Sequence, residues 1–145
     1  MSITVEKAKT KEQLELVFKI RREVFVLEQG VDPSDESDEF EESSNQFLAL
    51  LNESPAGAAR WRVTKNGIKL ERFAVLNGIR GQGVGQALVK AVLEDIAKIE
   101  ENKGKLIYLH SQLPAISLYL KFGFEKIGEM FEECNIKHYQ MERYL

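Results

Sequence analysis

Three glycines at every second position stand directly before a long helical pattern. Residues 70–99 read LERFAVLNGIRGQGVGQALVKAVLEDIAKI, with Gly81, Gly83 and Gly85 following Arg80. Glycine lacks a side chain, so successive backbone N–H groups can approach a ligand closely. A helix start carries unpaired N–H groups and a partial positive charge, and arginine adds charge-assisted donors. Together these residues predict a phosphate-binding turn.

Three further kinds of turn are also rich in glycine. A plain strand-to-helix turn rarely needs three glycines, because each of them costs chain entropy. A Walker-type phosphate loop requires Gly-Lys-Ser/Thr, which the sequence lacks. The dinucleotide fingerprint follows a first βαβ unit, whereas here the spacing is G-x-G-x-G and hairpins precede it. The plain turn remains the alternative.

The segment RGQGVG resembles the R/Q-x-x-G-x-G/A motif of the GNAT superfamily of acyl-CoA-dependent N-acyltransferases, where it holds the pyrophosphate of coenzyme A. The strand ERFAV, the helix QALVKAVLEDIAKI and the segment LYLKFGF occupy the places that they have in this family. RREVFVLEQGV and GEMFEECNIKHYQM are similar to the ElaA-like branch. That branch usually has glycine where this chain has Asn135, and commonly proline where it has Lys137.

The resemblance implies that acetyl-CoA is the co-substrate. In relatives the strand before the glycine turn hydrogen-bonds the pantetheine arm of the cofactor. A main-chain N–H near Val75 is expected to receive the oxyanion, which requires a local bulge in this strand. The expected cofactor-binding residues are Phe73, Ala74, Val75, Arg80, Gly81, Gln82, Gly83, Val84, Gly85 and Gln86.

Acyl transfer from a thioester to an amine also needs a neutral amine and a proton for the departing thiolate. Relatives carry a tyrosine facing the sulfur at the position of Tyr119, which we expect to be the proton donor; alternatively it seals its helix against the sheet. Glu71 is the first candidate for the general base and Glu28 the second, with ordered water as the alternative to both. Strand alternation places Glu71, Phe73 and Val75 on one face unless a bulge intervenes.

Two histidines and one cysteine complete the reactive side chains. His110 ends the strand YLH and His138 lies in IKHYQM; lone histidines are more often structural than catalytic, although the branch resemblance favours His138 slightly. Cys134 and His138 form a C-x-x-x-H pair without the second half of a zinc site, so no metal is expected.

Composition argues against several functions. The net charge of −3 argues against a nucleic-acid partner, because phosphate binding requires a basic surface. The single cysteine and the polar start MSITVEKAKTKEQ indicate a reducing compartment and no signal peptide. No run of about twenty apolar residues is present, so no membrane partner is expected. We expect a cytoplasmic monomer or homodimer.

An acidic segment and the helix before it complete the N-terminal half. The segment VDPSDESDEFEESSN is expected to be a solvated loop because like charges crowd there; the alternative is a lid that attracts a polycationic amine. In the amphipathic helix before it, Arg21 and Arg22 are expected to face solvent.

The elements follow the order β-α-(loop)-β-β-β-α-β-α-β-β, with Asn66-Gly67 marking one hairpin. Early hairpins and a later crossover helix predict an α/β chain (α+β in some schemes) with a mixed sheet, forming a single domain over residues 1–145. The resemblance implies the GNAT fold, a mostly antiparallel, twisted sheet of six to seven strands flanked by helices.

The function that these features favour is an acetyl-CoA-dependent N-acetyltransferase. The acetyl group would move to a primary amine of a small molecule or peptide by direct attack in a ternary complex. A non-catalytic acyl-CoA-binding or sensor module on the same fold is the alternative, because the cofactor site is clearer in the sequence than any base.

Overall fold

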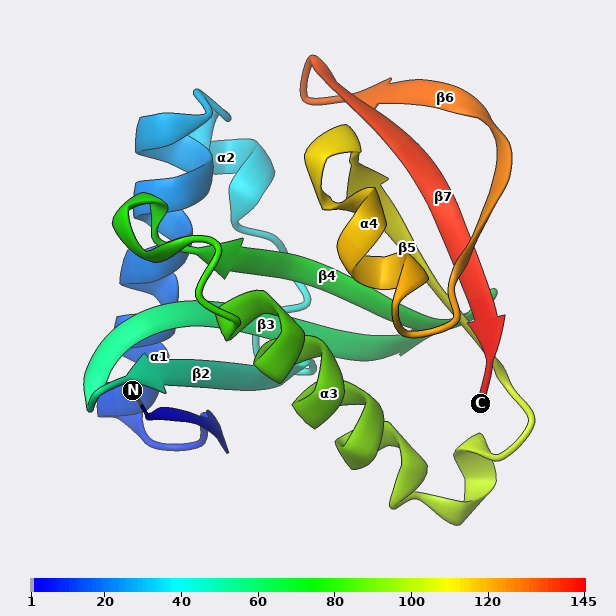
Figure 1. The fold of residues 1–145 in the computed structure, drawn as a ribbon, viewed down its shortest axis with the longest axis horizontal. Coiled ribbons are helices and arrows are strands. Elements are labelled where there is room, and N and C mark those ends of the chain that lie inside the picture. Colours follow the sequence, from blue (N-terminus) through cyan, green and yellow to red (C-terminus); the bar gives the residue numbers. More distant parts are fainter. Residues whose placement is uncertain (1) are drawn as a thin grey trace.

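A twisted sheet of seven strands runs through the centre of the molecule in a computed structural model that describes residues 2–145 (Figure 1). Its order is β1-β2-β3-β4-β5-β7-β6, and among these residues every neighbouring pair is antiparallel except β4 and β5. The strands are β1 (Ile3–Lys7), β2 (Asn45–Leu51), β3 (Ser54–Thr64), β4 (Gly67–Val75), β5 (Leu106–Gln112), β6 (Glu125–Glu133) and β7 (Ile136–Tyr144). The predicted mixed, mostly antiparallel sheet is confirmed.

Helices cover both faces of this sheet. The α-helices are α1 (Lys11–Arg21), α2 (Pro33–Glu36), α3 (Val84–Ala97) and α4 (Ile116–Leu120). A π-helical segment, η1 (Arg22–Glu28), continues α1, and short 3-10 turns lie at η2 (Asn77–Ile79), η3 (Glu100–Asn102) and η4 (Leu113–Ala115). Helix α1 begins with a capping box, because Thr10 accepts from the N–H of Gln13 and the Gln13 side chain accepts in return. No helix in residues 2–145 has the length and apolarity needed to cross a membrane.

Each face of the sheet has its own apolar core. On one face α3 buries Val84, Leu88, Val89, Val92 and Ile96 against strand residues, as the helical spacing predicts. On the other face, Val17, Ile20 and Val24 of the α1–η1 helix pack against Leu48, Ala58 and Ala74. Two opposed helices therefore hold β3 and β4 between them.

A bulge interrupts β4 at the position that matters most for the site. Ala74 pairs with Ala58 and Glu71 with Arg60, so β4 has one more residue than β3 over this stretch. Arg72 adopts φ = 58°, which is unusual for a residue other than glycine. Because the bulge intervenes, Glu71 and Phe73 do not share a face: Glu71 contacts Arg60, whereas Phe73 packs against the core on the α3 side.

The bulge also marks the point where β4 and β5 separate. The two strands pair only where Ile68–Leu70 lie beside Ile107–Leu109, although β4 continues to Val75 and β5 to Gln112. Beyond Leu70, the edge of β4 that faces β5 has no strand partner within residues 2–145. The sheet therefore opens at its centre.

Buried ion pairs fasten the acidic segment onto this bulge. Arg60 is 0% exposed and binds Asp38, Glu41 and Glu71 at 2.5, 2.8 and 2.9 Å. Arg72 donates to the Glu36 carbonyl and to Asp38, both at 3.1 Å. Burial alone would raise the pKa of Asp38, but its hydrogen bond with Arg60 and the Arg60 charge lower that pKa to about 2.

This network corrects two expectations. The prediction that Arg21 faces solvent is wrong, because Arg21 is 1% exposed and binds Glu36 at 2.6 Å and Glu41 at 2.7 Å. The acidic segment is not simply a solvated loop, because three of its carboxylates compensate two buried arginines. Helical periodicity alone could not reveal these partners, which lie 15 and 20 residues further along the chain from Arg21.

Replacing Arg60 with methionine should lower the free energy of unfolding by about 3 kcal/mol, because buried carboxylates would lose their counter-charge while the volume is nearly kept. Urea unfolding followed by circular dichroism measures this change. The control is Arg22→Met, at an exposed position that should change stability by less than about 0.5 kcal/mol. Equal effects of the two substitutions would contradict the proposed importance of the network.

Candidate functional site

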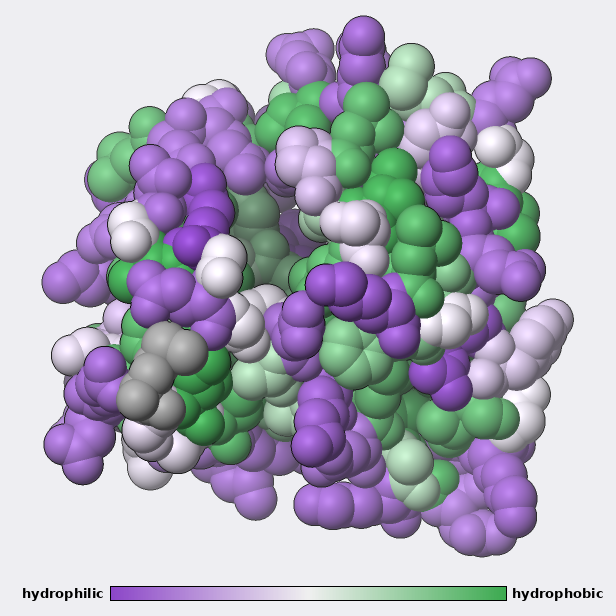
Figure 2. Space-filling model, in the orientation of Figure 1, coloured by the Kyte–Doolittle hydropathy of each residue, from purple (hydrophilic) through white to green (hydrophobic). Residues whose placement is uncertain are grey.

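Two cavities meet at the opening between β4 and β5. The larger, called the groove, has a volume of about 680 Å³ and lies between the end of β4, the start of α3 and the η4–α4 segment. The smaller, called the pocket, has a volume of about 180 Å³ and lies among β4, β5, the β6–β7 hairpin and α2. Figure 2 shows the surface hollowed between the α1 side of the molecule and α4. The residues that line both cavities are Gln29, Phe73, Gln112, Ala115 and Tyr119.

The glycine turn forms one wall of the groove. Gly83, with φ = 98°, is the N-cap of α3 and supplies no capping side chain. The N–H groups of Val84, Gly85 and Gln86 have no acceptor within the described residues; the first N–H of this helix to find one is that of Ala87, which donates to Gly83 at 3.1 Å. A helix start with free N–H groups beside a cavity suits an anion such as a phosphate.

Close packing behind the turn explains the last glycine. A Cβ on Gly85 would lie 3.3 Å from Cδ2 of Leu118, so a larger residue would press against α4. Every predicted cofactor-binding residue except Gln82 lines the groove. The turn and the free end of β4 are therefore brought together around one cavity.

Arg80 lies in this groove but is held by a carboxylate. Its guanidinium binds the two oxygens of Glu28 at 2.6 Å each and donates to the Val75 carbonyl at 3.0 Å. The hydrogen bond from Arg80 lowers the pKa of Glu28. Glu28 lines the groove rather than the pocket and its carboxylate is engaged by Arg80, so the geometry does not support its expected role as a base.

Tyr119 is buried at the junction of the two cavities. Its ring makes edge contacts with Phe73 and Phe124, at centroid distances of 6.0 and 5.9 Å. Burial raises the pKa of its phenol above the ordinary value of 10, so the hydroxyl keeps its proton near neutral pH. No hydrogen-bond partner for this hydroxyl is present in residues 2–145. The phenol is therefore available to a bound molecule.

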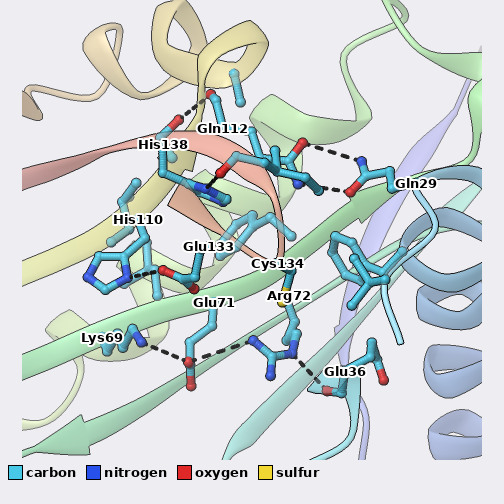
Figure 3. Close-up of a pocket in the computed structure, with 18 of the residues that line it drawn as sticks. Gln29, Glu36, Lys69, Glu71, Arg72, His110, Gln112, Glu133, Cys134 and His138 are labelled. Carbon is cyan, nitrogen blue, oxygen red and sulfur yellow. Dashed lines mark hydrogen bonds and ion pairs between the residues drawn. The ribbon is translucent and has the colours of Figure 1, made fainter. Parts of the chain in front are cut away.

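A pair of glutamines spans the same junction. Gln29 follows η1 and Gln112 ends β5, and their amides bond reciprocally at 2.9 and 3.3 Å (Figure 3). Glu28, the last residue of η1, lines the groove, and Gln29, which follows it directly, lines both cavities. The end of this π-helical turn therefore contributes to both cavities. π-helical turns inside longer helices are frequent at functional sites.

Glu71 lies in the pocket, but cations surround it. Its carboxylate contacts Arg62 at 2.5 Å and Arg60 at 2.9 Å. It also contacts Lys69 at 3.2 Å and Arg72 at 4.0 Å, as Figure 3 shows. Burial would raise its pKa, but the hydrogen bond of Arg62 and the charges of Arg60 and Lys69 bring that pKa to about 2. A carboxylate of such low basicity is a poor proton acceptor near neutral pH, so the geometry does not support the first candidate for the base.

Two histidines enter the pocket from β5 and β7 (Figure 3). Nδ1 of His110 lies 2.8 Å from Oε2 of Glu133, and Nδ1 of His138 lies 2.7 Å from the Ile136 carbonyl. The sequence marked both as more often structural than catalytic, with only the branch resemblance favouring His138 slightly. The C-terminal hairpin brings His138 opposite Gln112 on β5, a long-range pairing that a single sequence does not display.

Comparison with known proteins agrees with this geometry. The family model described as "Acetyltransferase (GNAT) domain" matches residues 5–145. The uncharacterised N-acetyltransferase YjcF of Bacillus subtilis is 40% identical over 135 residues, which cover 92% of this chain and 94% of that protein. The ElaA protein of Escherichia coli is 31% identical over 137 residues, which cover 90% of this chain and 87% of ElaA.

Solved structures agree in fold. The crystal structure of Escherichia coli ElaA has a TM-score of 0.81, is 27% identical in sequence, and covers 99% of both chains. A GNAT family acetyltransferase from Elizabethkingia anophelis, solved with acetyl-CoA bound, has a TM-score of 0.71 at 18% identity and covers 99% of this chain and 98% of its own. The predicted similarity to the ElaA-like branch is confirmed.

Because of the ion pairs of Glu71, the free energy of unfolding should fall as the pH is lowered. Its pKa is about 2 when folded and 4.5 ordinarily, so its contribution is complete above pH ~5 and is lost as pH falls through the folded pKa. Between pH ~6 and pH ~3 the wild type should lose about 2 kcal/mol more unfolding free energy than Glu71→Gln. Urea unfolding at the two pH values measures this difference.

The matched control for this experiment is Glu129→Gln, at an exposed position on β6. It should follow the wild type at both pH values. The same pH dependence in wild type and Glu71→Gln would show that this carboxylate contributes nothing to acid sensitivity.

Proposed function

The chain belongs to the GNAT acetyltransferase family, whose members transfer acyl groups from coenzyme A, and from this premise we propose that it is an acetyl-CoA-dependent N-acetyltransferase. The acceptor is a primary amine of a small molecule or peptide, which attacks the thioester directly in a ternary complex. A related protein of the same fold has been solved with acetyl-CoA bound, which supports the choice of cofactor.

The observation that carries the proposal is the free helix start in the groove. The N–H groups of Val84, Gly85 and Gln86 lie without protein acceptors beside a cavity of about 680 Å³. A pyrophosphate supplies the acceptors and the negative charge that such a helix start favours. Arg80 is close enough to add a cationic donor once its guanidinium turns from Glu28.

The proposed position of the rest of the cofactor is based on the course of β4. The edge of β4 beyond Leu70 has no partner strand, so its main-chain groups are open to the amide groups of a pantetheine arm. An arm that runs from the glycine turn along β4 reaches Phe73 and Tyr119, where the groove meets the pocket. The thioester is placed at this junction, and the acceptor amine enters from the pocket.

Chemistry at the junction then uses groups that are already in place. The amine nitrogen attacks the carbonyl carbon of the thioester; the new C–N bond forms and the C–S bond breaks. A main-chain N–H of the bulged β4 segment near Val75 stabilises the oxyanion. Tyr119 gives its proton to the departing sulfur, a role that suits a phenol kept protonated by burial.

One observation favours the alternative of a non-catalytic acyl-CoA-binding module. Both carboxylates that the sequence offered as bases are engaged in ion pairs, Glu28 with Arg80 and Glu71 with Arg60, Arg62 and Lys69. Binding alone requires no base. Kinetic and binding measurements on the same variants separate the two functions.

Replacing Gln86 with glutamate tests the cofactor site. Gln86 is exposed in the first turn of α3, where an added negative charge stabilises the helix but repels a pyrophosphate. Acetyl-CoA should bind about tenfold more weakly, equivalent to about 1.4 kcal/mol, as measured by isothermal titration calorimetry. Gln86→Met has nearly the same size without the charge and should stay within about twofold of wild type. Unchanged affinity in Gln86→Glu would overturn the proposed site.

Removing the hydroxyl of Tyr119 separates enzyme from sensor. Tyr119→Phe should lower kcat by about 100-fold in an assay of thiol release, with acetyl-CoA affinity unchanged, because only proton transfer is lost. Tyr144→Phe is the control, since Tyr144 is 69% exposed and lines neither cavity. A wild-type protein that binds acetyl-CoA but releases no thiol with any primary amine would favour the sensor.

A further inference from the structure

We propose that His138 is the proton acceptor for the incoming amine, an inference that rests on the proposed transferase function. His138 lies on β7, is 7% exposed, and lines the pocket rather than the groove. It pairs across the sheet with Gln112, one of the few residues that line both cavities. The imidazole is therefore on the side from which the amine must approach.

Hydrogen bonding fixes which nitrogen of the ring can accept a proton. Nδ1 of His138 lies 2.7 Å from the carbonyl oxygen of Ile136. A carbonyl only accepts hydrogen bonds, so Nδ1 must carry the hydrogen in the neutral ring and Nε2 keeps its lone pair. Nε2 has no hydrogen-bond partner in the part of the chain that the structure describes. The free lone pair thus belongs to a ring that lines the pocket.

Aromatic packing fixes the plane of the ring. The imidazole of His138 stacks on Phe131 with a centroid distance of 5.8 Å and an interplanar angle of 21°. Phe131 in turn contacts His110 edge-on at 5.1 Å. A proton acceptor must hold its lone pair in one direction, and a ring held on one side by a stacked phenyl and at Nδ1 by a carbonyl meets that requirement.

The remaining candidates in the site are less suited. Glu71 is surrounded by four cations, and Glu28 lies in the groove with Arg80. The side chain of His110 is bound to Glu133. On β5, His110 lies two residues before Gln112, the strand partner of His138, and is therefore further from the junction of the cavities.

The proton steps balance with Tyr119 as the second participant. An ammonium gives one proton to Nε2 of His138 and becomes a neutral amine. The amine attacks the thioester carbonyl, the C–S bond breaks, and sulfur takes the proton of Tyr119. The phenol regains its proton from the new amide nitrogen, and His138 releases its proton to solvent. The net reaction yields an amide, a free thiol and one proton.

The first test is the tautomer of His138 in the wild-type protein. The chain has only two histidines, so nitrogen-15 NMR of the imidazoles gives two ring systems, and His110→Gln assigns them. The inference requires that neutral His138 carries its hydrogen on Nδ1 and none on Nε2. Hydrogen on Nε2 would overturn it, because the nitrogen proposed to take the proton would then be a donor. This test needs no acceptor, and its readout is taken on the wild-type chain.

The second test uses thiol release from acetyl-CoA near neutral pH with ethanolamine, benzylamine, 1,3-diaminopropane and aniline as acceptors. His138→Gln should lower kcat by about 100-fold or more with the alkylamines, which arrive as ammonium ions, while acetyl-CoA affinity and the thermal midpoint stay as in wild type. With aniline, which arrives neutral, the loss should be at least tenfold smaller, because the first proton transfer is no longer needed.

The matched control is Lys137→Gln, an exposed neighbour on β7 that lines neither cavity and should transfer at the wild-type rate. Wild type and His138→Gln acetylating alkylamines equally fast would overturn the role of His138 and leave the transferase proposal standing. A wild-type protein that binds acetyl-CoA but acetylates none of the four amines would overturn both.

Discussion

At Arg72 the backbone of β4 leaves the extended conformation, and a set of buried charges holds it there. The guanidinium of Arg72 reaches the Glu36 carbonyl and Asp38, while Arg60 binds Asp38 and Glu71 on either side. A positive φ outside glycine is unfavourable by the order of 1 kcal/mol, so it persists only where surrounding contacts determine it. The acidic segment therefore stabilises a deformation of the sheet, and the parting of β4 from β5 depends on that deformation.

The two cavities at the separation of β4 and β5 differ in their chemical character. On one side lie the open edge of β4 and the uncapped start of α3, both of which offer N–H donors. On the other side lie histidines and carboxylates with fixed partners. Tyr119 stands between the two, buried and protonated. In the proposed function, an anionic cofactor and a cationic acceptor would thus meet surfaces of complementary polarity at one point.

Local patterns in the sequence predicted the order of the elements and most of the residues that line the groove. Glycine spacing placed the start of α3, and all of the predicted cofactor-binding residues except Gln82 line one groove. The acceptor side depends on contacts between distant segments, which no local pattern reports. A single bulge in β4 places Glu71 on the face opposite Phe73. Arg21 is buried rather than exposed because it forms an ion pair with Glu36, which lies in another segment of the chain. His138 acquired its place only through the pairing of β5 with β7.

The uncapped start of α3 also makes the stability of the fold responsive to any anion that binds there. A helix that leaves three N–H groups without protein acceptors is incomplete until an anion occupies them. Any ligand that binds only the native state shifts the unfolding equilibrium by mass action, by about 2.7 kcal/mol at a concentration one hundred times its dissociation constant. If the proposed acyl-CoA site is correct, the chain should therefore be harder to unfold when its coenzyme is present than when it is absent.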